Sequence, residues 1–160
     1  MRLTTKYLKT VFAISLLLAL ASIALAIEEG SFLARSFPEK IGDFARVSVK
    51  KDDAAIRGDV TDAAIAKYAA GASEIEWRGM AFFTSEEAFA ALERTMNSYN
   101  AEGVKFHSVK NVEGKVRYAV IETKEKIVCC WVNKQRKNLF FIATGQLPEI
   151  ESFMRAQWTW

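Results

Sequence analysis

Hydrophobic and polar residues alternate along several stretches of this chain, which is the pattern of strands that cover a core with one face. In residues 44–50 (FARVSVK) the expected buried face carries Ala45, Val47 and Val49. In residues 74–83 (EIEWRGMAFF) it carries Ile75, Trp77, Ala81 and Phe83. The polar segment KDDAAIRGD, which follows the first strand, is expected to be a loop.

The stretch between these strands, VTDAAIAKYAAGAS, fits two structures. Its alanines favour a helix. Its short length and the turn-forming AAGAS, which leads directly into the next strand, favour a strand. We expect a strand over residues 62–69, paired as a hairpin with residues 74–83.

The clearest helix signal lies in residues 84–103. Thr84 is a good N-cap, and Glu87 three residues later completes a capping box. An apolar stripe at helical spacing follows, formed by Phe89, Leu92, Met96 and Tyr99. Gly103 is expected to end the helix.

Four apolar stretches separated by short polar turns come next. They predict antiparallel strands over residues 104–110, 116–123, 126–133 and 139–145. Pro148 then opens a last helix, whose apolar stripe consists of Ile150, Phe153, Met154 and Trp158.

This order of elements (β-β-β-α-β-β-β-β-α) indicates the α+β class. We expect a mostly antiparallel sheet of about six or seven strands, with two helices packed on one of its faces. The chain shows no internal repeat and no linker rich in Pro, Gly or Ser. We therefore predict a single domain over residues 41–160, preceded by a tether over residues 27–40.

The N-terminal residues have the pattern of a targeting signal. Three basic residues precede an uncharged run of 17 residues from Val11 to Ile27, which contains the small-residue motif Ala24-Leu25-Ala26. This pattern predicts a secretory signal peptide over residues 1–26, cleaved between Ala26 and Ile27.

Two other interpretations of this segment stay open. One is an uncleaved membrane anchor over residues 10–27, because a spanning helix needs about 17–25 apolar residues. The other is a helix buried in a protein that is not exported. Both the signal peptide and the anchor place the domain outside the cytoplasm, in the periplasm or the extracellular space, and an uncleaved segment would tether it to the cytoplasmic membrane.

Cleavage changes the charge of the protein. The full chain has 22 Lys and Arg against 19 Asp and Glu, and removal of the three basic residues in 1–26 leaves 19 of each. The basic isoelectric point therefore gives no support for nucleic-acid binding. Residues 27–102 carry a net charge of −5 and residues 103–160 a net charge of +5. This asymmetry fits a mixed solvated surface or a dipolar molecule whose C-terminal half attracts an acidic partner or anionic lipid headgroups.

The side chains needed for common catalytic and metal sites are scarce. His107 is the only histidine, and we expect it on the exposed face of its strand, opposite Phe106. The adjacent acidic pairs Asp52-Asp53 and Glu86-Glu87 fit a solvated loop and a first helical turn. Metal-ligand spacings, a G-x-S-x-G motif and glycine-rich phosphate loops are absent from the sequence. We therefore predict no catalytic residue, metal or cofactor.

Cys129 and Cys130 are the only cysteines and lie side by side in an apolar strand. Neighbouring strand residues point to opposite faces, so we expect each thiol to pack into a core on its own side. An intermolecular disulfide, a disulfide between the two neighbours and a redox function are the alternatives.

These patterns favour a non-catalytic binding or accessory domain on the outer side of the cytoplasmic membrane. Its expected partner is a protein or a small apolar ligand. The aromatic residues chosen as a candidate contact surface are Phe82, Phe140, Trp158 and Trp160. The alternative is an extracytoplasmic enzyme or thiol redox protein that uses Cys129 and Cys130.

Overall fold

The computed structural model describes residues 30–99, 104–112, 114–146 and 148–157. Within them, eight strands form one antiparallel sheet in the order β1-β2-β3-β4-β8-β7-β6-β5. The strands are Lys40–Ile41 (β1), Phe44–Lys51 (β2), Val60–Ala70 (β3), Ser73–Phe82 (β4), Lys105–Val112 (β5), Lys115–Glu122 (β6), Ile127–Val132 (β7) and Leu139–Gly145 (β8). The helices are Phe32–Ser36 (α2), Ser85–Ser98 (α3) and Glu149–Gln157 (α4). The α+β class and the antiparallel sheet in a single domain are confirmed, with one strand and one helix more than predicted.

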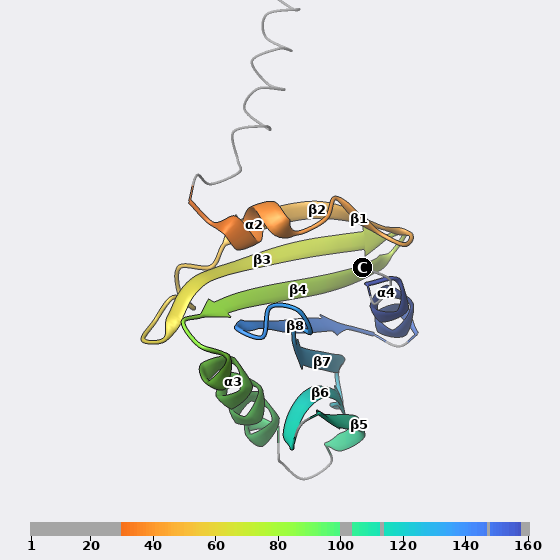
Figure 1. Cartoon of the computed structure of the whole chain (residues 1–160). Helices are drawn as coiled ribbons and strands as arrows, with labels where there is room; N and C mark the ends of the chain where they lie inside the picture. The colour runs from red at the N-terminus through yellow and green to blue at the C-terminus, as the bar shows by residue number, and fades with distance from the viewer. Residues whose placement is uncertain (1–29, 100–103, 113, 147, 158–160) are drawn as a thin grey trace, which may run out of the picture.

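The connection through α3 determines the order of the strands. The chain leaves β4, passes through α3 and begins β5 at the opposite edge of the sheet. Strands β5 to β8 then return as a meander, so that β8 pairs with β4 and Trp77 lies opposite Ala143. Figure 1 shows that β3 and β4 run across the view, whereas β6 and β5 curl away at the far edge.

The ambiguous alanine-rich stretch is a strand. It forms β3, which is paired with β4 along its whole length from Val60 to Ala70. Ala70 lies opposite Ser73, so the connection is a two-residue turn. Gly71 in this turn has a φ of +61°, a conformation that glycine adopts readily and that tight hairpin turns require. The predicted hairpin is confirmed.

Helices cover both faces of the sheet, so the prediction that they share one face is wrong. Buried residues of α2 and α4 pack into one apolar cluster, and those of α3 pack into a second cluster on the other side. Cys129 belongs to the first cluster and Cys130 to the second. All six residues of β7 are buried, which requires a cover on each face.

Helix α3 confirms its sequence signal. The hydroxyl of Thr84 accepts a hydrogen bond from the Glu87 amide at 3.3 Å, and the Glu87 carboxylate accepts one from the Thr84 amide at 2.9 Å. Leu92 is fully buried against the sheet. The predicted stop at Gly103 lies outside the described residues.

The tether prediction for residues 27–40 is wrong for the part that the structure describes. Residues Phe32–Ser36 form α2, and Leu33, Ala34 and Phe37 are buried in the first apolar cluster. The domain therefore includes the segment from Ser31 onward.

A buried carboxylate on β3 holds the start of α2. The Ser31 hydroxyl caps the helix by accepting a hydrogen bond from the Ala34 amide at 3.0 Å. Asp62 accepts hydrogen bonds from the Ser31 hydroxyl at 3.1 Å and from the Leu33 amide at 3.0 Å. These bonds attach the short helix to a strand about thirty residues away in sequence, because charged acceptors give strong hydrogen bonds.

The side-chain pattern predicted for residues 44–50 is right for Val49 but wrong for Ala45 and Val47, which are exposed. A β-bulge between Arg46 and Ser48 leaves Val47 without a partner residue on β3, and its side chain is 68% exposed. The extra residue reverses the alternation, so that Phe44 before the bulge and Val49 after it both pack on the first apolar cluster.

Candidate functional site

A cavity of about 260 Å³ lies between α4 and the curled end of the sheet. Its walls come from β5, β6, β7 and α4. The lining residues are His107, Tyr118, Val120, Ile127, Cys129, Ile150, Glu151 and Met154. The surface of the cavity is mostly apolar, although only four of the eight side chains are aliphatic or thioether groups and the other four are a phenol, an imidazole, a carboxylate and a thiol.

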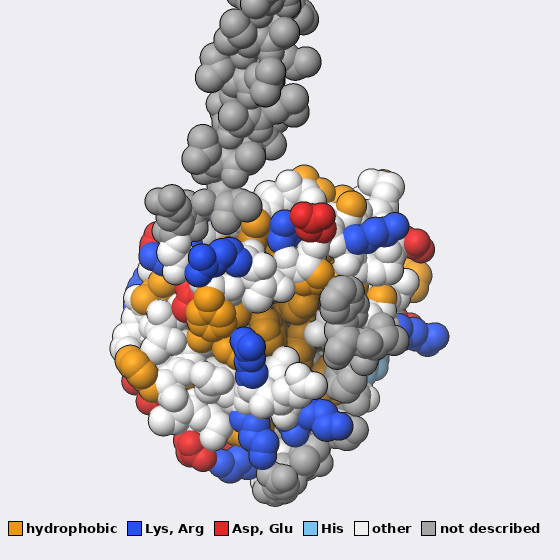
Figure 2. All heavy atoms as spheres, turned by 45° about the horizontal axis from the view of Figure 1, so that its top comes forward, with side chains coloured by type: hydrophobic (Ala, Val, Ile, Leu, Met, Phe, Trp, Pro, Cys, Tyr) orange, Lys and Arg blue, Asp and Glu red, His pale blue; other side chains and the backbone are white. Residues whose placement is uncertain are grey.

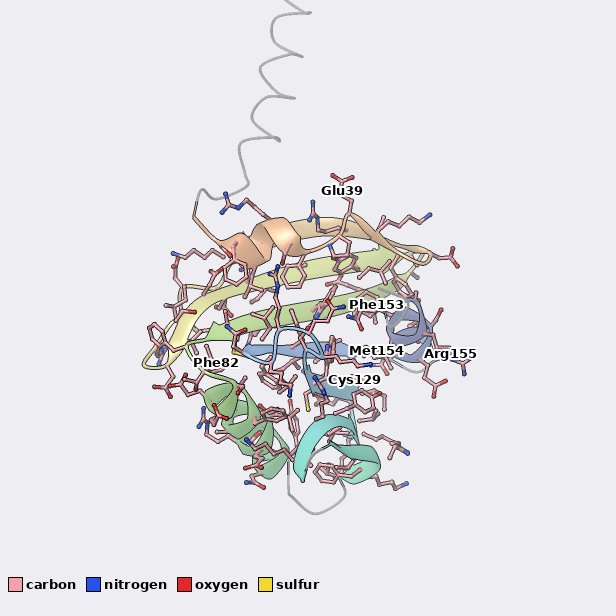
Figure 3. The ribbon with its side chains drawn as sticks, viewed as in Figure 1. Glu39, Phe82, Cys129, Phe153, Met154 and Arg155 are labelled. Atoms are coloured by element: carbon pink, nitrogen blue, oxygen red, sulfur yellow. The ribbon has the colours of Figure 1, made fainter. Side chains whose placement is uncertain are left out.

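The sheet register and the helical spacing place these side chains together. Val120 lies directly opposite Cys129 in the β6–β7 ladder, so both point to the same face. On α4, Ile150 and Met154 are four residues apart and therefore face the sheet together. Figure 3 shows Cys129 and Met154 near each other, whereas Arg155 extends away on the outer side of α4.

The polar groups of the cavity form two contacts. His107 Nε2 and Glu122 Oε2 form a hydrogen bond, which is an ion pair when the imidazole is protonated. Tyr118 and Cys129 form a side-chain hydrogen bond that favours the thiolate. Glu151 lies on the exposed side of α4 and reaches the same cavity.

Burial dominates the chemistry of the two thiols. It raises the pKa of Cys129 to about 11, against the opposing effect of the Tyr118 hydrogen bond and with a further increase from the Glu151 charge. Burial, together with the neighbouring Cys129, raises the pKa of Cys130 to about 12. Burial also raises the pKa of Tyr118. Both thiols are free and protonated at neutral pH, and the packing prediction is confirmed.

His107 occupies a special position on the edge strand. A β-bulge lies between Phe106 and Ser108, so His107 has no partner residue on β6. Its side chain is exposed, as predicted. It nevertheless lines the cavity, which the simple alternation of the strand does not predict.

The two described residues of the candidate contact surface are buried inside the protein. Phe82 is 3% exposed and Phe140 is 1% exposed, because both pack in the cluster under α3. Trp158 and Trp160 lie outside the described residues. Phe83, expected on the buried face, is instead exposed beyond the end of β4. Phe82 and Phe83 have therefore exchanged the roles that the sequence suggested.

Sequence reasoning missed most of the cavity. The sequence gives no sign that a cavity is lined by Tyr118, Val120 and Glu151, since each fits an ordinary position in a strand or a helix. A cavity arises from the distance between α4 and the sheet, and that distance depends on tertiary packing.

Figure 2 shows apolar side chains gathered in a hollow on the face that carries α2, framed by polar and charged groups.

Two structural findings bear on metal and membrane binding. Among the described residues, no group of three His, Cys, Asp or Glu side chains is arranged to hold a metal ion. In that same part of the chain, no helix has the length and hydrophobicity to cross a membrane. The predicted signal peptide or anchor and its cleavage site lie outside the described residues.

Comparisons with known proteins give no relative from which a function can be transferred. No family model matches the chain, and no curated protein or solved structure matches it either.

Proposed function

We propose that this chain is a non-catalytic binding domain, exported or held at the outer side of the cytoplasmic membrane, that takes up a small and largely apolar ligand. The observation that carries the proposal is the cavity of about 260 Å³ between α4 and the sheet. A cavity of roughly 150 Å³ holds a benzene molecule, so this one has room for about ten non-hydrogen atoms.

A small ligand fits the structure better than a partner protein bound through the predicted aromatic surface. Two of the four residues of that surface, Phe82 and Phe140, are buried. The cavity has an apolar lining with a few polar groups, which is the usual composition of a small-molecule site. The location outside the cytoplasm is supported by the N-terminal sequence pattern.

The alternative of a thiol enzyme is supported by one observation and opposed by two. The cavity brings Cys129, His107 and Glu151 to one place. However, the pKa of Cys129 is raised to about 11, whereas a thiol nucleophile needs a lowered pKa. The imidazole of His107 is bonded to Glu122, and the hydrogen bond of the thiol goes to Tyr118.

Equilibrium dialysis against 2-phenylethanol, a neutral probe of suitable size, tests the binding function. The assay uses the full-length protein after any cleavage that occurs in the cell. If the N-terminal segment is retained, the protein is held in lipid nanodiscs, and empty nanodiscs serve as the blank. Val120→Phe fills part of the cavity and should weaken binding at least about tenfold. Val47→Phe makes the same change at an exposed position and should leave binding unchanged.

The result that contradicts the proposal is equal binding by Val120→Phe and the unchanged protein, or no binding by either. Val120→Leu, a smaller enlargement, replaces Val120→Phe if circular dichroism shows that the larger variant is unfolded. Loss of a catalysed thiol reaction in Cys129→Ala would favour the enzyme instead.

A further inference from the structure

One carboxylate at the cavity has no cationic partner among the described residues. Glu151 lines the cavity from α4. In the described part of the chain, no Lys or Arg nitrogen lies within salt-bridge distance of it. Arg155, one turn further along α4, extends away from the cavity (Figure 3). The negative charge of Glu151 therefore remains available to a ligand.

The other carboxylate near the cavity already has a basic partner. Glu122 is bonded to His107 on the neighbouring strand. Among the described residues, no ion pair of this kind reaches Glu151. Glu151 acts on the cavity wall itself, since its charge raises the pKa of both Tyr118 and Cys129.

We propose that the cavity binds a small primary amine, with the apolar body of the ligand against Val120, Cys129 and Met154 and its ammonium group at Glu151. An ammonium has three donors, and a carboxylate is its strongest common acceptor in proteins. The ring of Tyr118 in the same wall offers a second favourable contact, because cations are attracted to aromatic faces. A ligand carboxylate at this position would be repelled by Glu151.

This inference rests on the proposed binding function, and the experiment separates the two. The full-length protein is dialysed against 2-phenylethylamine, 2-phenylethanol and phenylacetate, which share one aromatic body and differ in charge. We expect the amine to bind about tenfold tighter than the alcohol, because a charged hydrogen bond replaces a neutral one. Phenylacetate should bind more weakly than the alcohol.

Glu151→Gln removes the charge and keeps the shape of the side chain. It should abolish the preference for the amine while binding of the alcohol changes less than about twofold. Glu93→Gln makes the same change on the exposed side of α3, in the helix on the opposite face, and should keep the preference.

Each outcome has a distinct meaning. Equal affinity for amine and alcohol, or a preference that survives Glu151→Gln, overturns the amine assignment and leaves the binding function in place. Failure of all three probes to bind overturns the binding function and the amine assignment together.

Discussion

Helix α2 provides the sharpest test of the structure, because the sequence suggested a tether where the structure has a core element. The perturbation is Phe37→Ala, at the residue that follows the last turn of α2. The matched control is Phe32→Ala, the same chemical change at the first residue of the helix. A tether predicts that both substitutions are nearly neutral, whereas the structure predicts a large difference.

The packing of Phe37 sets the magnitude. Its side chain is 3% exposed, and its ring centroid lies 4.8 Å from that of Trp77 and 6.4 Å from that of Phe141. Gly79 makes room for these rings, since a Cβ built there would lie 2.8 Å from Phe141 and 3.2 Å from Phe37. Removing a buried phenylalanine ring costs about 3–5 kcal/mol. Phe32 is 39% exposed, so its loss should cost less than about 1 kcal/mol.

Urea unfolding followed by near-ultraviolet circular dichroism measures both costs. We expect the midpoint of Phe37→Ala to fall strongly at an unchanged m value, which would show that stability and not compactness has changed. The midpoint of Phe32→Ala should stay near that of the unchanged protein. Costs below about 1 kcal/mol for both variants would refute the placement of α2 in the core.

Three further predictions concern helix α3, the two cysteines and the N-terminal segment. Leu92→Ala should cost about 2–5 kcal/mol in a denaturant titration and Glu93→Ala less than about 0.5 kcal/mol, and equal costs would mean that the buried face of α3 is wrongly assigned. Cys129 and Cys130 should resist a bulky thiol reagent until the protein is denatured, and their double alanine variant should lose about 1–3 kcal/mol. In the folded protein the pKa values of both thiols lie above the ordinary thiol value of 9.0, so these thiols ionise first in the unfolded protein. The free energy of unfolding should therefore fall from pH 9 upward, and it should fall less steeply in the double alanine variant. Intact-mass measurement should give a mature protein that begins at Ile27, and a mass that includes residues 1–26 would leave the anchor.

Local signals in the sequence predicted the elements whose causes are local. The capping box of Thr84 and Glu87 lies within one turn of α3, and the turn at Gly71 joins two strands that are adjacent in the chain. Such features depend on neighbours a few residues away, so the sequence displays them directly.

Helix α2 escaped prediction because its stability is not local. Five residues are too few for a helix that is stable on its own. It is held by Asp62 on β3 and by the burial of Leu33, Ala34 and Phe37. None of these contacts leaves a periodic pattern in residues 27–40.

The bulges show a second limit of the sequence pattern. One extra residue at Val47 reverses the alternation of β2, and one at His107 interrupts that of β5. A bulge is set by how two strands twist against each other, so hydrophobic periodicity carries no sign of it. At His107 this matters for the site, because the bulged residue lines the cavity.

The paired cysteines connect the packing of β7 to the candidate site. On the face toward α4, β7 presents Ile127, Cys129 and Trp131 in succession. The ring of Trp131 stacks on Phe141 at 5.6 Å and fills its part of the layer. Cys129 is much smaller, and its neighbour across the ladder is only a valine, so the space below α4 stays open there. Cys129 is a packing residue, as the sequence suggested, and its small size beside large aromatic rings also leaves open the cavity that the proposed ligand would occupy.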